Sequence, residues 1–99
     1  MSSISSIALS GMNAAQTALE ASAGNVANAN TPGYKRREVV NTAQADGGVT
    51  ATVRISDQEG SSLEADAVSQ LQAKNAFLAN LAVFKTGSRL AGAILDKEA

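Results

Sequence analysis

The sequence predicts a mainly α-helical chain in which two long terminal helices pair as an antiparallel coiled-coil hairpin, with a small β-hairpin between them. Helical apolar periodicity at both ends predicts the two helices, and alternating apolar residues in the middle predict the strands. At 99 residues the chain forms at most one structural domain. We divide it into an N-terminal helix at 1–30, a turn, hairpin and linker at 31–60, and a C-terminal helix at 61–99.

The first helix is predicted from residue 3 to about residue 29, with Ser2 or Ser3 as the N-cap. It ends near Asn30, because a residue that precedes proline, here Thr31 before Pro32, is pushed out of the α region. Gly33 then supports a turn. The residues on the predicted coiled-coil seam recur at spacings of four and three and are Ala8, Met12, Ala15, Leu19, Ser22 and Val26.

The middle of the chain changes from helical to strand periodicity. Val39 and Val40 fall in a first short strand, and residues 49–55 form a second one whose alternate residues are apolar. Asp46, Gly47 and Gly48 predict the turn between them. Residues 56–62 read as a polar linker, in which Ser61 and Glu64 form a capping-box signature for the next helix.

The second helix is predicted from about residue 63 to residue 96. Its seam again follows spacings of four and three, and its members are Phe77, Leu81, Phe84, Ser88, Ala91 and Leu95. Other apolar residues nearly encircle this helix, so one partner helix cannot cover its surface. Because Ala supplies most of the apolar residues, an isolated chain would bury little area. The sequence therefore predicts further apolar contacts with neighbouring molecules.

Composition argues against several function classes. The chain has no Cys and no His, which removes the usual zinc ligands, the usual general base and the usual nucleophile pairs. We therefore expect no enzyme activity, no catalytic or metal site and no cofactor. Glu64 and Asp66 lie in the first turn of a helix, where acidic residues favour the helix dipole, so a catalytic pair is disfavoured. A net charge of −1 without a basic patch predicts no nucleic-acid partner.

The sequence also predicts no direct membrane insertion, because no stretch approaches the roughly 20 apolar residues of a membrane span. The N-terminus has no Lys or Arg before Lys35 and no continuous apolar run. We therefore expect no cleaved secretory signal peptide.

Several asparagines lie at or beside the apolar seams. We expect the amides of Asn25, Asn28 and Asn80 to make hydrogen bonds between helices and to set their register, as a buried Asn does in coiled coils. For Asn80, a partly exposed amide at the edge of the seam is an equally weighted alternative. The segment from Tyr34 to Arg37 could form a binding patch, although a helix stop followed by a solvated strand edge is favoured.

Two segments carry a resemblance to a known family. LSGMNAAQTALEASAGNVANANTPGYKRREV, residues 9–39, closely resembles the N-terminal signature of bacterial flagellar basal-body rod proteins and their hook and hook-associated relatives. QAKNAFLANLAVFKTGSRLAGAILD, residues 72–96, resembles the C-terminal signature of the same family. The resemblance implies paired terminal helices, stacking of many copies into the tubular flagellar axis, and export through the flagellar type III apparatus. It places the chain in the periplasmic rod of the basal body.

These observations predict a structural axial subunit that polymerises through its terminal helices and contacts copies of itself and other axial proteins. The alternative is a small helical-hairpin chaperone or regulator that binds a partner helix. The predicted assembly interface comprises Met12, Ala15, Leu19, Asn25, Val26, Asn28, Phe77, Asn80, Leu81, Phe84 and Leu95. The predicted motif turn comprises Asn30, Thr31, Pro32, Gly33 and Tyr34. The short middle leaves no room for the outer domains of hook-like members.

Overall fold

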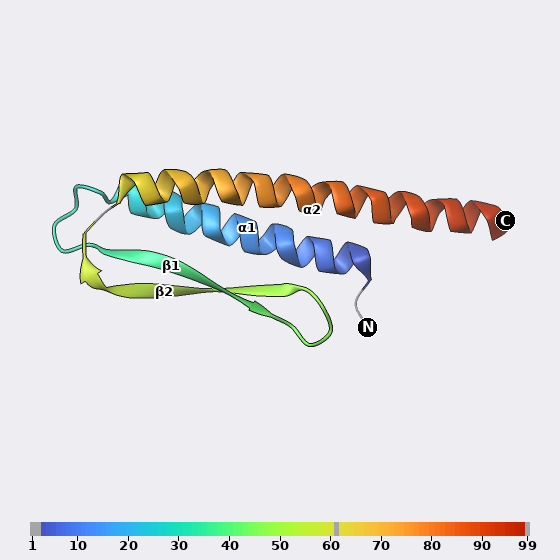
Figure 1. Cartoon of the computed structure of the whole chain (residues 1–99), viewed down its shortest axis with the longest axis horizontal. Coiled ribbons are helices and arrows are strands. Elements are labelled where there is room, and N and C mark those ends of the chain that lie inside the picture. Colours follow the sequence, from blue (N-terminus) through green and yellow to red (C-terminus); the bar gives the residue numbers. More distant parts are fainter. Residues whose placement is uncertain (1–2, 61, 99) are drawn as a thin grey trace.

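The computed structural model describes residues 3–60 and 62–98 and contains two helices and two strands within those residues (Figure 1). Helix α1 spans Ile4–Ala27, strand β1 Lys35–Ala43, strand β2 Val49–Glu59 and helix α2 Leu63–Glu98. The chain is elongated, with extents of 62 × 24 × 14 Å.

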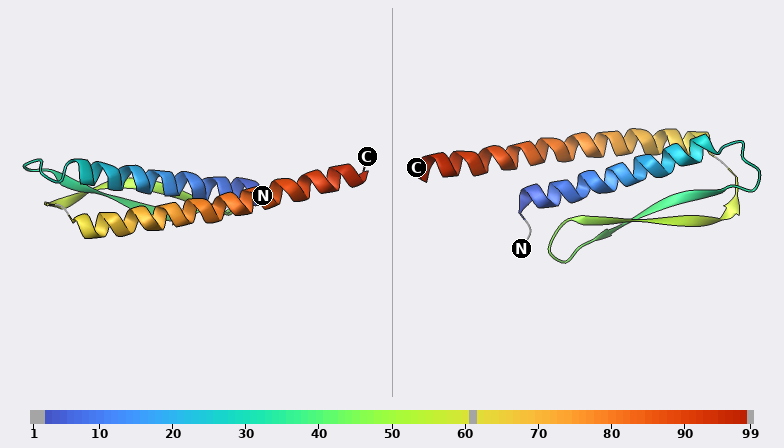
Figure 2. Two further views of the ribbon diagram at one scale, coloured as in Figure 1. Left: turned by 90° about the horizontal axis from the view of Figure 1, so that it is seen from above. Right: turned by 180° about the vertical axis from the view of Figure 1, so that it is seen from behind.

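The two helices pack against each other and run in opposite directions, as predicted. Figure 1 shows α1 between α2 and the β-hairpin, and the views in Figure 2 show both strands running alongside α1. The mainly helical fold class predicted from the sequence is therefore confirmed.

Both ends of α1 follow from local sequence. Ser3 is the N-cap, and its hydroxyl accepts a hydrogen bond from the backbone N–H of Ser6 at 3.1 Å. The helix ends at Ala27, and Tyr34 N donates to Thr31 O at 3.3 Å across a turn that contains Pro32 and Gly33. Gly33 has φ 74°, which a proline–glycine turn of type II requires and a side chain would oppose.

The β-hairpin is longer than predicted. Strand β2 continues to Glu59, and Lys35 pairs with Glu59 after an irregularity between Lys35 and Arg37. The predicted linker at 56–62 is therefore wrong for residues 56–59. Pairing with the start of β1 resumes at Glu59, and Gly60 N donates to Tyr34 O at 3.3 Å just beyond it, so polar side chains do not prevent a strand here. The predicted turn at 46–48 is confirmed, with Gly47 N donating to Gln44 O at 3.1 Å.

Helix α2 begins where Ser62 Oγ accepts from Ala65 N at 3.4 Å. Ser61 of the predicted capping box lies outside the described residues. Near the opposite end, Gly87 of α2 lies against Ser5 of α1. Because α1 begins at Ile4, the part of α2 after Gly87 extends beyond α1 (Figure 1).

The core consists mainly of small side chains. Among the described residues, its buried apolar members are Ala8, Met12, Ala14, Ala15, Ala21 and Ala73. The predicted α1 seam holds for Ala8, Met12 and Ala15, but Leu19 and Val26 are 42% and 40% exposed within the chain. The hairpin packs on a second side of α1, which shifts burial away from the strict seam.

Candidate assembly site

The residues predicted to form the assembly interface do not lie on one surface of the chain. Met12, Ala15 and Asn25 are buried inside it, and Leu19 and Val26 are exposed. The half-buried members are Asn28, Phe77, Asn80, Leu81 and Phe84. The side chain of Leu95 lies outside the described residues. Among the described members, the fold thus buries three, half-buries five and leaves Leu19 and Val26 exposed.

Large apolar side chains remain exposed on both helices. Leu9 is 47% exposed on α1, and Leu71 and Ile94 are each 59% exposed on α2. Other exposed examples on the helices are Ile4, Ile7, Leu19, Val26, Leu63, Val68, Leu78, Val83 and Leu90. Contiguous apolar patches are typical of surfaces that bind another protein, and the assembly interface stays a prediction.

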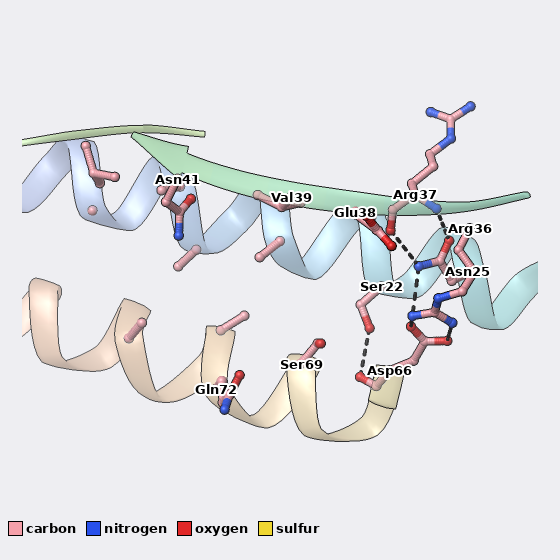
Figure 3. A pocket seen from close by; sticks show the side chains of 18 of the residues that line it. Ser22, Asn25, Arg36, Arg37, Glu38, Val39, Asn41, Asp66, Ser69 and Gln72 are labelled. Carbon is pink, nitrogen blue, oxygen red and sulfur yellow. Dashed lines mark hydrogen bonds and ion pairs between the residues drawn. The ribbon is translucent and has the colours of Figure 1, made fainter. Parts of the chain in front are cut away.

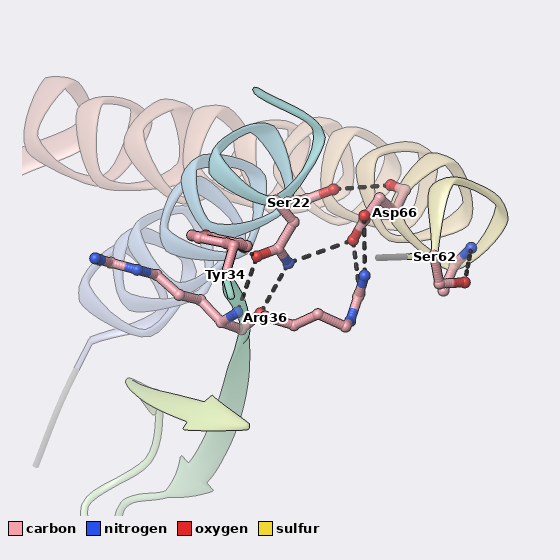
Figure 4. Close-up of polar contacts among 8 residues, drawn as sticks. Ser22, Tyr34, Arg36, Ser62 and Asp66 are labelled. Carbon is pink, nitrogen blue, oxygen red and sulfur yellow. Dashed lines mark hydrogen bonds and ion pairs between the residues drawn. The ribbon is translucent and has the colours of Figure 1, made fainter. Parts of the chain in front are cut away.

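A polar cluster joins the end of α1 to the starts of β1 and α2, and Figure 4 shows Ser22, Tyr34, Arg36 and Asp66 in it. Asn25, which is 2% exposed, bonds several of its members. Its Nδ2 donates to Arg37 O at 2.9 Å and to Asp66 Oδ1 at 3.3 Å. Its Oδ1 accepts from Arg37 N at 2.8 Å and from Tyr34 OH at 3.2 Å. The amide therefore uses both donors and both acceptor positions.

Asp66 also bonds several members of this cluster and is only 1% exposed. Its carboxylate accepts two hydrogen bonds from Arg36, from Nη2 at 2.7 Å and from Nη1 at 3.0 Å. These bonds raise the pKa of the Arg36 guanidinium above its ordinary value, and burial opposes the rise. Ser22 Oγ donates to the backbone oxygen of Asp66 at 2.8 Å. A buried charge that is paired in this way fixes where α2 begins relative to α1.

The predicted motif turn positions the cluster. It reverses the chain after α1, so that Tyr34 and the first residues of β1 return to Asn25. Its first residues, Asn30 and Thr31, are exposed, and Thr31 Oγ1 donates to Asn28 Oδ1 at 3.2 Å. The turn therefore brings Tyr34, the side chain of Arg36 and the backbone of Arg37 into the cluster.

The expected hydrogen bonds between helices are found for one asparagine of the three. Asn25 bonds Asp66 across the helix contact. The expectation is wrong within the chain for Asn28, which donates to Gly24 O at 2.9 Å, and for Asn80, which donates to Ala76 O at 2.8 Å. Both carbonyls belong to the residue four positions earlier in the same helix, which satisfies the amide without a partner helix.

A groove of about 520 Å³ lies between α1, β1 and α2 (Figure 3). Its α1 side is lined by small side chains, including Gly11, Ala14 and Ala18. Val39 and Asn41 line it from β1, and Ser69, Gln72 and Ala76 line it from α2. The polar cluster lies at one end of the groove, and Asn80 lies beside Gly11 at the other.

Sequence reasoning assigned Asp66 to the helix dipole and missed its burial. One signal was available: Asp66 lies seven residues before Ala73, so the two share a face of α2. A charge on a buried face must be paired. The partner, Arg36, could not be identified from spacing, because the hairpin that carries it returns only through tertiary packing.

Within the described residues there is no cluster of three or more metal-ligating side chains and no helix long and apolar enough to cross a membrane. The polar cluster has a closed set of partners, so its arrangement is suited to holding elements together.

A family model matches part of the chain. The family model of the flagella basal body rod protein matches residues 6–35, which cover α1 from Ser6 onward, the motif turn and the first residue of β1. No curated protein matches the chain. The family match confirms the N-terminal resemblance and supports a structural role in the basal body, in association with other axial components. The C-terminal resemblance at 72–96 stays a prediction.

Proposed function

We propose that this chain, whose residues 6–35 carry the signature of the flagella basal body rod family, is an axial subunit that polymerises through its two helices. The observation that carries the proposal is the position of this signature. It falls on a helix that packs against α2 on one side and exposes Leu9, Leu19 and Val26 elsewhere. A contact between unlike surfaces that does not close produces a filament or tube.

In this proposal the chain supplies rigid helices and no chemistry. The buried Asn25 and Asp66 hold α1, β1 and α2 in one arrangement, so that each copy presents the same exposed faces to its neighbours. The partners are other copies and other axial proteins, and the location is the periplasmic rod. Delivery through the flagellar type III export apparatus, without a cleaved signal peptide, belongs to the same proposal.

Electron microscopy of purified basal bodies from cells that carry a labelled copy tests this function. The expected result is label on the rod together with normal swimming. Label confined to the cytoplasm, with unlabelled rods in motile cells, would contradict the proposal.

The groove between α1, β1 and α2 favours a second candidate function. An open groove beside two helices can bind an amphipathic helix of another protein, as in a small chaperone or regulator. A binding module of this kind would form a complex of fixed stoichiometry with its partner. An axial subunit would instead form assemblies that grow with its own concentration.

A further inference from the structure

Helix α2 carries a second apolar seam on the side that faces away from α1. Its members recur at spacings of three and four and are Val68, Leu71, Asn75, Leu78 and Ala82. All five are exposed, and Val68, Leu71 and Leu78 are 55%, 59% and 51% exposed. At 3.6 residues per turn they lie about 180° around α2 from Asp66 and Ala73, which are buried against α1. We call this set the ridge.

We propose that the ridge of one copy inserts into the groove between α1, β1 and α2 of a second copy. This inference rests on the proposed function and names the contact through which the copies add to one another. It joins two unlike surfaces of the same chain, so it leaves a free ridge at one side of each pair and a free groove at the other.

The two surfaces match in length and shape. The groove follows α1 from Gly11 to Asn25, and the ridge spans the same number of helical residues, so each is about 21 Å long at 1.5 Å per residue. The groove is lined by Ala and Gly on α1, and the ridge carries Leu and Val. Large side chains opposite small ones allow two surfaces to interdigitate without voids.

Polarity and charge also match. The ridge bears no charged residue. Of the four charged residues that line the groove, Arg36 and Asp66 bind each other, Glu38 binds Arg54, and the side chain of Arg37 is directed away from the groove (Figure 3). Insertion would therefore bury no unpaired charge. The ridge contains one amide, Asn75, near its middle, and the groove walls offer Ser69 and Gln72 as hydrogen-bond partners.

The groove is continuous with the contact that α1 already makes with α2. Ser22 and Asn25 line the groove and bond Asp66 across that contact. A docked helix would thus extend an existing helical packing. A contact about 21 Å long and one helix, about 10 Å, wide covers roughly 200 Å², far below the roughly 800 Å² per partner of a stable dimer. The chain is therefore suited to an array in which each copy uses both surfaces, rather than to an isolated dimer.

Disulfide trapping between copies tests the proposal, because the chain has no cysteine. Ala18→Cys places a thiol in the groove, and Leu78→Cys places one on the ridge. Gln16→Cys is the control, since Gln16 is exposed on α1 and is absent from the groove lining. The purified single-cysteine chains are assembled alone or in equal mixtures, oxidised, and separated without reductant.

The mixture of Ala18→Cys and Leu78→Cys should shift from the 10.0 kDa monomer band to a band of twice that mass. Either chain alone, and the mixture of Gln16→Cys with Leu78→Cys, should stay at the monomer band. The proposal would be overturned if Gln16→Cys linked to Leu78→Cys as well as Ala18→Cys does, or if either single-cysteine chain linked to itself. Assembled material that shows no disulfide linking at all would overturn it too.

Sedimentation of the same samples under reducing conditions separates this contact from the proposed function. Chains that sediment as assemblies but do not link through Ala18→Cys and Leu78→Cys would overturn the ridge and groove contact and leave the axial role intact. Chains that remain monomeric at every concentration would overturn both.

Discussion

The amide of Asn80 occupies the space that a side chain at Gly11 would fill. A Cβ built on Gly11 of α1 would lie 2.6 Å from both Nδ2 and Oδ1 of Asn80 on α2. The lack of a side chain at position 11 therefore allows α2 to bring a polar side chain directly onto the backbone of α1. This relationship fixes the distance between the helices where the groove ends.

Gly11→Ala should therefore fail to give the usual gain of Ala over Gly in a helix, which is about 1 kcal/mol. The new methyl group displaces Asn80 and breaks its 2.8 Å bond to Ala76 O. In Gly11→Ala/Asn80→Ala the gain should reappear, with a coupling of about 0.5 kcal/mol or more between the two sites. Urea unfolding of the parent, the two single variants and the double variant measures this coupling energy.

Gly92→Ala is the matched control for this cycle. Gly92 is an exposed position in α2, and a Cβ there has no neighbour within 4 Å. This variant should gain at most about 1 kcal/mol, and less because the end of α2 that carries Gly92 opens locally, but the change should not depend on the residue at position 80. Additive effects of Gly11→Ala and Asn80→Ala would show that their contact has no energetic consequence.

Asp66→Ala should lower the free energy of unfolding by about 2 kcal/mol, because it leaves Arg36 and Asn25 without their shared acceptor. The estimate lies below the value for a fully buried pair, since the Arg36 side chain is 22% exposed. Glu38→Ala, which removes the exposed pair with Arg54, should change stability little. Equal losses in the two variants, measured by urea unfolding, would contradict the central role of Asp66.

Gly48→Ala should loosen the tip of the β-hairpin from α1. Gly48 has φ 93°, and a Cβ there would lie 2.7 Å from Ser10 Oγ, which accepts from Val49 N at 3.0 Å. The strained backbone costs about 1 to 3 kcal/mol. Hydrogen exchange should show faster exchange at the Val49 amide, with the amides in the middle of α1 unchanged. Unaltered exchange at Val49 would rule out this anchoring role.

The part of α2 beyond Gly87 should be the least protected part of the helix in dilute solution. Leu90 is 56% exposed there, and α1 does not extend to cover it. Helical segments with few packed contacts open locally at low free-energy cost. Hydrogen exchange should therefore be fast after Gly87 in dilute protein and slow after assembly. Equal protection along α2 in dilute protein would argue against a free end that requires a neighbour.

Substitutions on the two sides of α2 should separate folding from assembly. Phe84→Asp places a charge on the half-buried side and should lower the melting temperature. Leu78→Asp lies on the exposed ridge and should leave the melting temperature nearly unchanged while abolishing sedimentation of assemblies. The reverse pattern would mean that the inner and outer faces of α2 are wrongly assigned.

The parts of the fold that were predicted correctly depend on local chemistry. The Pro32–Gly33 turn follows α1, which ends at Ala27, two residues before its predicted end; the glycines at 47–48 form the hairpin turn, and periodicity places both helices. The missed parts depend on tertiary packing. The extension of β2 to Glu59 requires pairing with Lys35. The buried side of α1 includes Ala14 and Ala21, which lie off the predicted seam, whereas Leu19 on the seam is exposed.

For the site, sequence reasoning found Asn25 because an amide beside an apolar seam requires partners. It missed the burial of Asp66, because the helix dipole alone is enough to explain an acidic residue in the first turn of a helix. For Asn80 it gave equal weight to a bond across the helices and to a partly exposed amide at the edge of the seam; the amide is half-buried, and Ala76 O satisfies it within α2. The contact of Asn80 with Gly11 is steric, and polar patterning does not reveal it.

Sedimentation velocity of the purified chain across a wide range of concentrations tests the central claim of self-assembly most directly. The mean mass should rise above 10.0 kDa with increasing concentration and reach no fixed plateau, because each added copy presents a new free surface. A single 10.0 kDa species at every concentration would contradict the claim, and so would a closed oligomer of fixed mass.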